Sequence, residues 1–291
     1  METSPVAQAF IDAPIHFAST DAGKIAFRRV GDGPHLIFLH GWPLSGLTYR
    51  KLVPHLQSHF TCWVLDSLGC GESRWESRAD FSFTNQAATL VQAIRQLDLP
   101  NFSIVAHDTG GSIARLMAGD LTPHLQHLIL MNTEIPGHRP PWIPLYRWLM
   151  HVPGVETSLN ILLKSKWYRR SSMGFNGCFY DKCLIDGSFY QHMIRPLLND
   201  HRKLNGQRRY LTGLDWKQID DLAGAHGAID AKVHLIWGSD DPTFPEPLAR
   251  DMAHQFKRRG GFYSLDKAKL LVHEERPEKV ADLIKHCLMK A

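Results

Sequence analysis

The chain mixes two spacings of hydrophobic residues. Short apolar runs rich in β-branched and aromatic residues predict strands, and longer stretches with apolar residues three or four apart predict helices. The predicted strands are 15–18, 24–30, 35–40, 61–66, 102–107, 125–131, 232–237 and 261–265. The predicted helices are 47–56, 85–97, 111–119, 247–255 and about 277–288. The first two strands form a hairpin through the turn at residues 21–23, and strands then alternate with helices.

This alternation predicts an α/β fold, with a mostly parallel sheet and helices on both faces. After Thr133 the pattern stops at a proline-rich turn, residues 135–141, and an aromatic-rich helical region follows up to about residue 214. We interpret that region as an inserted helical cap. The expected division is a core of residues 1–134 and 216–291, interrupted by a cap of residues 135–215.

Composition narrows the class of protein. The 291 residues are 44% hydrophobic, with a net charge of +4 from scattered Lys and Arg, so we expect no nucleic-acid partner. The five cysteines are an odd number without metal-ligand spacing, which favours reduced thiols and no metal. No apolar run approaches the roughly 20 residues that span a bilayer, and no signal-peptide pattern opens the chain. We expect a cytoplasmic monomer or homodimer with no cofactor and no membrane partner.

The most informative segment is residues 105–111, VAHDTGG, which places Asp108 on a sharp turn between a predicted strand and a predicted helix. A side chain lifted out on such an elbow needs small neighbours, and Gly110 and Gly111 supply them. The helix N-terminus also favours an anion. Asp108 is therefore a candidate nucleophile, although aspartate also caps helices in ordinary structural roles.

Two further loops end predicted strands, HGWP at residues 40–43 and DSLGCGES at residues 66–73. In open parallel sheets, ligands bind at this edge. Together with the Asp108 elbow, these loops resemble the α/β-hydrolase superfamily over nearly the whole chain. The resemblance is to the branch of epoxide hydrolases and haloalkane dehalogenases, in which Asp replaces the nucleophilic Ser. It implies an α/β-hydrolase fold, mostly parallel, with an inserted helical cap.

The resemblance also implies a reaction. A carboxylate can displace a leaving group from saturated carbon, so the expected intermediate is an alkyl ester on Asp108, formed from an epoxide or an alkyl halide. A histidine would activate water to hydrolyse this ester, and an acid would orient the histidine. By resemblance, the backbone amides of Trp42 and Thr109 are the oxyanion donors. Thr109 departs from many relatives, which have Trp after the nucleophile.

The acid has two candidates. Residues 237–242, WGSDDP, match the loop after the penultimate strand, where the family's carboxylate usually lies, and Asp241 has the matching register. Glu134 follows the strand that ends at Met131, and some dehalogenases carry their acid there. Either residue could instead be a carboxylate that caps a loop.

The histidine does not match the family pattern. Relatives place it four residues before an acidic pair, and here Leu270 stands four residues before Glu274, while His273 lies three residues further along the chain. Either the loop is rearranged so that His273 reaches the site, or the base is missing and His273 is an ordinary residue at a helix start.

Aromatic residues of the expected cap could assist the leaving group or contact the substrate. Tyrosine hydroxyls could protonate an opened epoxide and indole N–H groups could hold a halide, although each aromatic is more often a packing residue. The tyrosine candidates are Tyr146, Tyr168, Tyr180 and Tyr190. The tryptophan candidates are Trp142, Trp148 and Trp167, with Trp42 in the core. His40 and His107, in the loops at the strand ends, are further candidates for substrate contact.

Two functions remain open. The first is a hydrolase that opens an epoxide or displaces halide from a small apolar substrate through an Asp108 ester. The second is a catalytically reduced relative that binds a hydrophobic small molecule under the cap, because Leu270 occupies the register of the base.

Overall fold

A computed structural model describes residues 5–289 and contains one nine-stranded sheet within that range. The strands are β1 (Ile15–Thr20), β2 (Gly23–Val30), β3 (His35–Leu39), β4 (Thr61–Leu65), β5 (Arg74–Trp75), β6 (Phe102–His107), β7 (Leu125–Met131), β8 (Lys232–Gly238) and β9 (Arg259–Leu265). Their order is β1-β2-β4-β3-β6-β7-β8-β9, with β5 paired to β2. The pairs β1–β2, β2–β4 and β2–β5 are antiparallel, and the others are parallel. The carboxyl ends of the parallel strands therefore meet at one edge.

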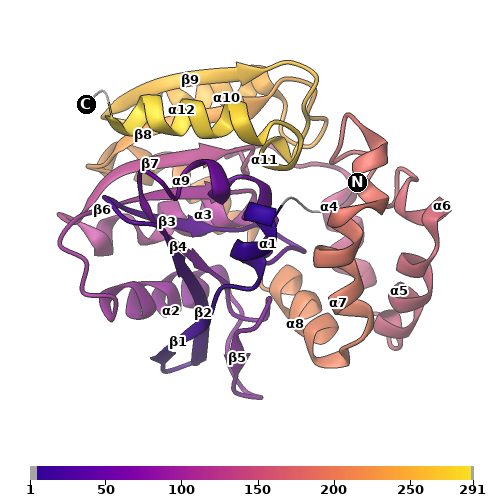
Figure 1. The fold of residues 1–291 in the computed structure, drawn as a ribbon. Coiled ribbons are helices and arrows are strands. Elements are labelled where there is room, and N and C mark those ends of the chain that lie inside the picture. Colours follow the sequence, from indigo (N-terminus) through magenta and orange to yellow (C-terminus); the bar gives the residue numbers. More distant parts are fainter. Residues whose placement is uncertain (1–4, 290–291) are drawn as a thin grey trace.

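Helices lie on both faces of this sheet (Figure 1). The α-helices are α1 (Pro5–Ile11), α2 (Phe83–Arg95), α3 (Thr109–Met117), α4 (Trp142–Leu149), α5 (Val155–Lys164), α6 (Lys166–Arg169), α7 (Arg195–Leu198), α8 (His201–Thr212), α9 (Trp216–Ala225), α10 (Glu246–Ala253), α11 (Val272–Glu275) and α12 (Pro277–Met289). Short helical turns are η1 (Gly46–Lys51), η2 (Val53–His55), η3 (Gly119–Leu121), η4 (Lys182–Asp186), η5 (Tyr190–Ile194) and η6 (His226–Ala228).

Alternation along each strand builds the two hydrophobic layers, because successive side chains point to opposite faces. In β3, Ile37 and Leu39 belong to the cluster that contains residues of α2, α3, α9 and α10. Leu36 and Phe38 belong to the cluster that contains residues of α1, η1, η2 and α12. The predicted fold class, a mostly parallel sheet covered on both faces, is therefore confirmed.

Some predicted elements differ from the structure. The single helix predicted at 47–56 is two 3₁₀ turns, η1 and η2, and Pro54 lies in the second of them. Because proline has no N–H to donate, it does not continue an α-helix from the preceding turn. The core helices α1, α9 and α11 and the short strand β5 were not predicted from the sequence.

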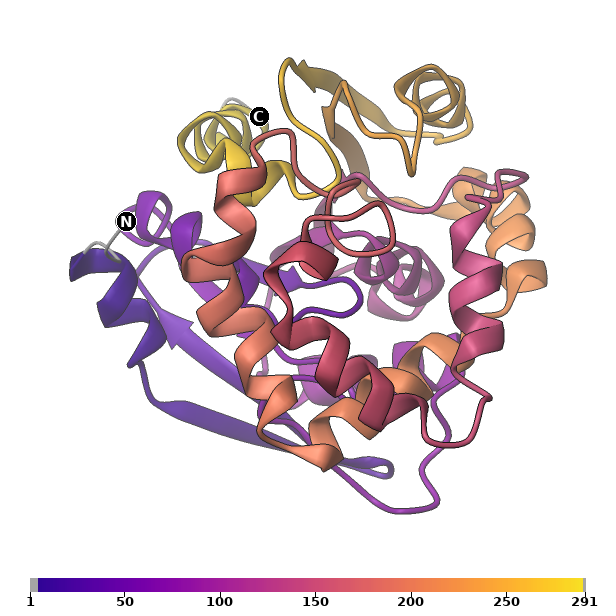
Figure 2. The same ribbon diagram turned by 90° about the vertical axis from the view of Figure 1, so that its right-hand side faces the viewer.

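Between β7 and β8 the chain forms the helices α4 to α9 and the turn η6, and we call the part from α4 to α8 the helical insertion (residues 142–212). The predicted boundaries at 135 and 215 fall in the loops on either side. Figure 2 shows the insertion in front of the core. Within residues 5–289, no helix is both long enough and apolar enough to cross a bilayer.

Two histidines are fully buried where α11 packs against the end of β6. The ring centroids of His107 and His273 are 4.5 Å apart. Burial lowers the pKa of His107 well below its usual value, and the neighbouring His273 adds to this. Burial also lowers the pKa of His273 to about 3, with further contributions from Arg50 and Lys51. Both rings are therefore neutral at physiological pH.

This pair makes the free energy of unfolding depend on pH. A depressed folded-state pKa means that the unfolded chain binds more protons below pH 6.5, so stability falls as the pH falls. We expect His273→Gln to remove about 2 kcal/mol of the stability loss between pH 7.5 and pH 5, from 1.4 kcal/mol per pKa unit. Urea unfolding at both pH values measures this. The exposed His55 provides the control His55→Gln, and an identical pH dependence in wild type and His273→Gln would contradict the prediction.

Candidate active site

Asp108 lies between β6 and α3 in an unusual backbone conformation, with φ 52° and ψ −133°. Glycines make room for this turn. A Cβ at Gly41 would lie 2.3 Å from the Asp108 carboxylate, and a Cβ at Gly110 would lie 2.5 Å from the carbonyl oxygen of His40. A Cβ at Gly111 would lie 2.5 Å from Thr133 Oγ1. The elbow expected at residues 105–111 is therefore formed, and its glycines are sterically required.

Two backbone amides hold the Asp108 carboxyl group. The Trp42 N–H donates to Asp108 Oδ2 at 2.9 Å, and the Thr109 N–H donates to the same carboxyl group. These are the two amides that the resemblance assigned as oxyanion donors. The carboxyl group is therefore fixed at the elbow, where it lines the pocket described below.

The electrostatic surroundings of Asp108 are dominated by burial. Burial raises its pKa well above the usual value, the charge of Glu134 raises it further, and the amides of Thr109 and Trp42 oppose the shift. Burial also raises the pKa of Glu134, and it raises that of Asp241 to about 7. The charges of Glu134 and Asp241 thus both raise the pKa of Asp108, in addition to burial.

The two candidate acids are held by different partners. Asn132 Nδ2 donates to Asp241 Oδ2 at 2.7 Å, and the Thr243 N–H donates to Asp241 Oδ1 at 2.8 Å. Ser112 Oγ donates to Glu134 Oε2 at 2.8 Å. Glu134 lines the pocket beside Asp108, whereas Asp241 does not. Neither carboxylate has a hydrogen bond to a histidine among the described residues.

The residue at the register of the missing base is Leu270, and it lines the same pocket as Asp108. His273 does not reach that pocket. Its Nε2 lies 2.8 Å from Thr48 Oγ1, and its ring packs against Tyr49 and His107. The structure therefore does not support the hypothesis that a rearranged loop brings His273 beside Asp108. Within residues 5–289, the pocket lining contains no histidine.

The loop that carries Leu270 is fixed by buried contacts. His107 Nε2 donates to the Leu270 carbonyl oxygen at 2.9 Å, and Lys269 N donates to Glu275 Oε2 at 2.8 Å. Glu274 is fully buried and paired with Arg50 Nη1 and, at 3.1 Å, with Arg50 Nη2. Removing one member of such a pair leaves the other charge buried without a partner, which is strongly destabilising. Moving His273 to the pocket would break these contacts. They therefore keep Leu270, and not His273, at the pocket wall.

The pocket has a volume of about 420 Å³. Apolar side chains from the core and from the segment between β7 and β8 form most of its wall, with a few polar groups. Besides Asp108 and Glu134, the polar groups include Thr109, Lys269 and Cys178. Burial raises the pKa of the Cys178 thiol, so this residue does not replace a nucleophile at neutral pH. Such a cavity suits a small, mainly apolar molecule.

Only some of the aromatic candidates reach the pocket. Trp42, Trp142 and Tyr146 line it, and burial raises the pKa of Tyr146 to about 12. Trp148 and Trp167 are 65% and 80% exposed, on the outside of the insertion.

Other candidates also have positions away from the pocket. Tyr180 is half exposed, and Tyr190 packs under the guanidinium of Arg169. His40 Nε2 accepts from the Ser67 amide, so this ring and His107 are buried supports of the strand ends rather than pocket residues. The structure therefore places these candidates away from the pocket that contains Asp108, and their roles in function stay predictions.

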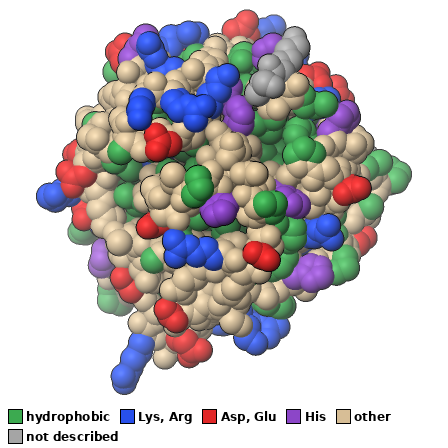
Figure 3. Space-filling view, turned by 90° about the vertical axis from the view of Figure 1, so that its left-hand side faces the viewer, with side chains coloured by type: hydrophobic (Ala, Val, Ile, Leu, Met, Phe, Trp, Pro, Cys, Tyr) green, Lys and Arg blue, Asp and Glu red, His purple; other side chains and the backbone are tan. Residues whose placement is uncertain are grey.

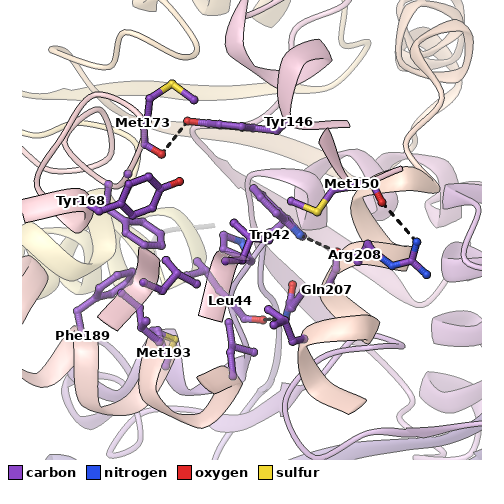
Figure 4. Close-up of a pocket in the computed structure, with 18 residues that line it drawn as sticks. Trp42, Leu44, Tyr146, Met150, Tyr168, Met173, Phe189, Met193, Gln207 and Arg208 are labelled. Atoms are coloured by element: carbon purple, nitrogen blue, oxygen red, sulfur yellow. Dashed lines mark hydrogen bonds between the residues drawn. The ribbon is translucent and has the colours of Figure 1, made fainter. Parts of the chain in front are cut away.

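A second cavity of about 100 Å³ lies beside the pocket, within the insertion (Figure 4). Trp42 and Tyr146 line both cavities, and Tyr168 lines only the second. The Trp42 indole N–H donates to the carbonyl oxygen of Gln207 at 2.9 Å, which fixes the indole between the cavities. The remaining lining is largely leucine, methionine and phenylalanine. The ligand space is therefore larger than the part that touches Asp108.

The sequence analysis missed several pocket residues. Lys269 and Cys178 line the cavity, as do Trp216 and Phe244. Lys269 could have been found from its place beside Leu270, whereas Cys178 comes from an irregular part of the insertion with no sequence signal. Within the described residues, no cluster of three or more His, Cys, Asp or Glu side chains could hold a metal ion.

Comparisons with known proteins agree with this architecture. The family model described as alpha/beta hydrolase fold matches residues 34–270. A cis-3-alkyl-4-alkyloxetan-2-one decarboxylase of Shewanella oneidensis is 30% identical over 140 residues, 46% of this chain. The match spans less than half, 43%, of that enzyme. The magnesium-chelatase 30 kDa subunit of Rhodobacter capsulatus is 35% identical over 255 residues, 87% of this chain and 86% of that protein.

Among solved structures, the epoxide hydrolase CorEH without ligand superposes with a TM-score of 0.77 at 21% identity, covering 95% of this chain and 99% of that one. At this identity the superposition supports the fold alone. The family match supports a hydrolase-type function without specifying a substrate. On the family match and the geometry together, the chain belongs to the alpha/beta hydrolase fold family.

Proposed function

We propose that this chain retains the substrate-binding pocket of a hydrolase and lacks the histidine base that would activate water. It binds a small apolar molecule in the pocket beside Asp108 and does not hydrolyse an Asp108 ester. The observation that carries this proposal is the position of Leu270, which lines the pocket at the register of the base, with His273 turned to Thr48.

The state of Asp108 supports the same proposal. Burial raises the pKa of the Asp108 carboxyl group, which disfavours the ionised form that would act as a nucleophile. The protonated form can still donate a hydrogen bond to a ligand oxygen or nitrogen. The name of the Rhodobacter capsulatus relative also describes a subunit of a chelatase rather than a hydrolase. A binding role for this chain accords with that name.

A second candidate function is the complete aspartate-branch reaction, in which Asp108 opens an epoxide or displaces a halide. The specific observation in its favour is that both oxyanion amides already point at the Asp108 carboxyl group. In that mechanism an Asp108 oxygen forms a bond to carbon as the carbon–oxygen or carbon–halogen bond breaks. Tyr146, on the pocket wall, is the group that could donate a proton to an opened epoxide.

A gain-of-function variant distinguishes the two candidate functions. If only the base is missing, Leu270→His should restore multiple turnovers on a panel of terminal epoxides and primary alkyl bromides. General-base catalysis typically contributes on the order of 10²-fold or more. Diol formation and bromide release are measured, with Leu270→Gln as a control of similar size. Multiple turnovers by wild type, at a rate equal to that of Leu270→His, would contradict the binding proposal.

Ligand binding is tested by a substitution at Gly177, which lines the pocket. A Cβ there would meet only Pro242 Cγ, at 3.8 Å, so a side chain has room to enter the cavity. We expect Gly177→Phe to weaken binding of N-phenyl-1-naphthylamine about tenfold or more by filling space that the probe needs. Fluorescence titration measures the Kd.

The matched control for that titration is Gly224→Phe, at an exposed position on α9. It adds the same side chain away from the pocket and should leave the Kd unchanged. Equal Kd values for wild type and Gly177→Phe would show that the probe binds elsewhere and would count against the pocket as the binding site.

A further inference from the structure

The outer face of α4, α5 and α6 exposes large apolar side chains. Trp148 is 65% exposed, Ile161 is 65% exposed and Trp167 is 80% exposed. Val152, in the loop between α4 and α5, is 41% exposed. We call these residues, together with Leu145 and Leu162, the outer apolar face. Single exposed apolar residues are ordinary, whereas a group of them on one part of a fold marks an interaction site.

The same three helices are apolar on both sides. In α5, Leu159 and Leu163 line the second cavity, while Ile161 and Leu162 are exposed. In α6, Tyr168 lines the cavity and the adjacent Trp167 is exposed. A surface helix normally has one apolar side, which faces the core, and its other side is polar. Within residues 5–289, only the inner side of these helices has a partner.

The charge around this face is positive. Residues 135–215 contain twelve Lys and Arg against five Asp and Glu, although the whole chain carries only +4. Lys164 and Lys166 lie beside Trp167 in sequence and are exposed. Lys166, at 3.9 Å, shares the Asp186 carboxylate with Arg169 and Arg170, so three cations face one anion and positive charge remains in excess. The one acidic residue between 142 and 170, Glu156, is paired with Arg208 at 2.7 Å. On the opposite side of the molecule, Lys and Arg are mixed with Asp and Glu (Figure 3).

We propose that the outer apolar face docks on the surface of an anionic lipid bilayer. Tryptophan side chains favour the boundary between lipid headgroups and acyl chains, and neighbouring Lys and Arg are attracted to anionic lipid headgroups. Figure 2, in which this side of the molecule faces the viewer, shows the insertion helices lying in front of the core. The sequence alone led us to expect no membrane partner, because it contains no spanning segment. Peripheral docking needs none.

A second copy of the chain fits this face less well. In a two-fold symmetric dimer, the same patch lies on both subunits. The cations around Trp167 would then be brought toward the cations of the partner. An anionic bilayer instead supplies the opposite charge and an apolar layer together.

The test is co-sedimentation of the full chain with phosphatidylcholine vesicles, with and without phosphatidylglycerol. We expect binding to the anionic vesicles, weaker binding to pure phosphatidylcholine, and release at high salt. The double variant Trp148→Ser/Trp167→Ser should lower partitioning about tenfold or more. Its matched control is Val6→Ser/Leu248→Ser, which alters exposed apolar residues on α1 and α10.

Charge is tested in the same assay. Lys164→Glu/Lys166→Glu should weaken binding to anionic vesicles, whereas Lys217→Glu, at an exposed position on α9, should not. A measurement on the unaltered chain guards against misfolded variants, since brominated lipid in the vesicles should quench its tryptophan fluorescence.

Three outcomes would overturn the proposal. They are no binding to anionic vesicles, binding that the tryptophan variant leaves unchanged, or a dimer in solution that the same variant dissociates, which would assign the face to a second copy. All these measurements are made without a pocket ligand, so their failure is distinguishable from failure of the proposed binding function.

Discussion

The turn at Asp108 is the constraint on which the rest of the site depends. Its positive φ lifts a carboxyl group out at the carboxyl edge of the sheet, and Gly41, Gly110 and Gly111 leave the space that this requires. The turn also brings two backbone amides to the carboxyl group. Since the insertion closes over this edge, the carboxyl group is buried and its pKa rises. One backbone conformation thus sets the position and the hydrogen bonding of the central residue, and its burial raises the pKa.

The loop after β9 determines whether a base is available to hydrolyse an ester on Asp108. A hydrolase of the aspartate branch needs a base that delivers water to the ester, and the wall at that point is the side chain of Leu270. The buried pairing of Glu274 with Arg50, and the bond from His107 to the Leu270 carbonyl oxygen, fix this arrangement. The nearby His273 instead packs against Tyr49 and His107 in the core. The pocket has room for a small molecule, and among residues 5–289 no histidine lines it that could activate water.

Much of this organisation could be predicted from residues close together in sequence. The elbow is contained in seven residues, and the register of Leu270 follows from counting back from Glu274. The place of His273 could not be predicted, because it depends on the contact between Glu274 and Arg50, which are 224 residues apart. The insertion was harder still. Its short helices carry apolar residues on two sides, so Tyr168 faces a cavity while Trp167 beside it is exposed.

The measurement that tests the central claim most directly is the stoichiometry of the wild-type reaction. The chain is incubated with a large excess of an epoxide or an alkyl bromide, and the diol or bromide formed is counted per protein chain. The account predicts no more than one equivalent, because an ester on Asp108 would have no base to hydrolyse it. Many equivalents per chain, abolished by Asp108→Asn, would show that the site hydrolyses its ester and would contradict the account.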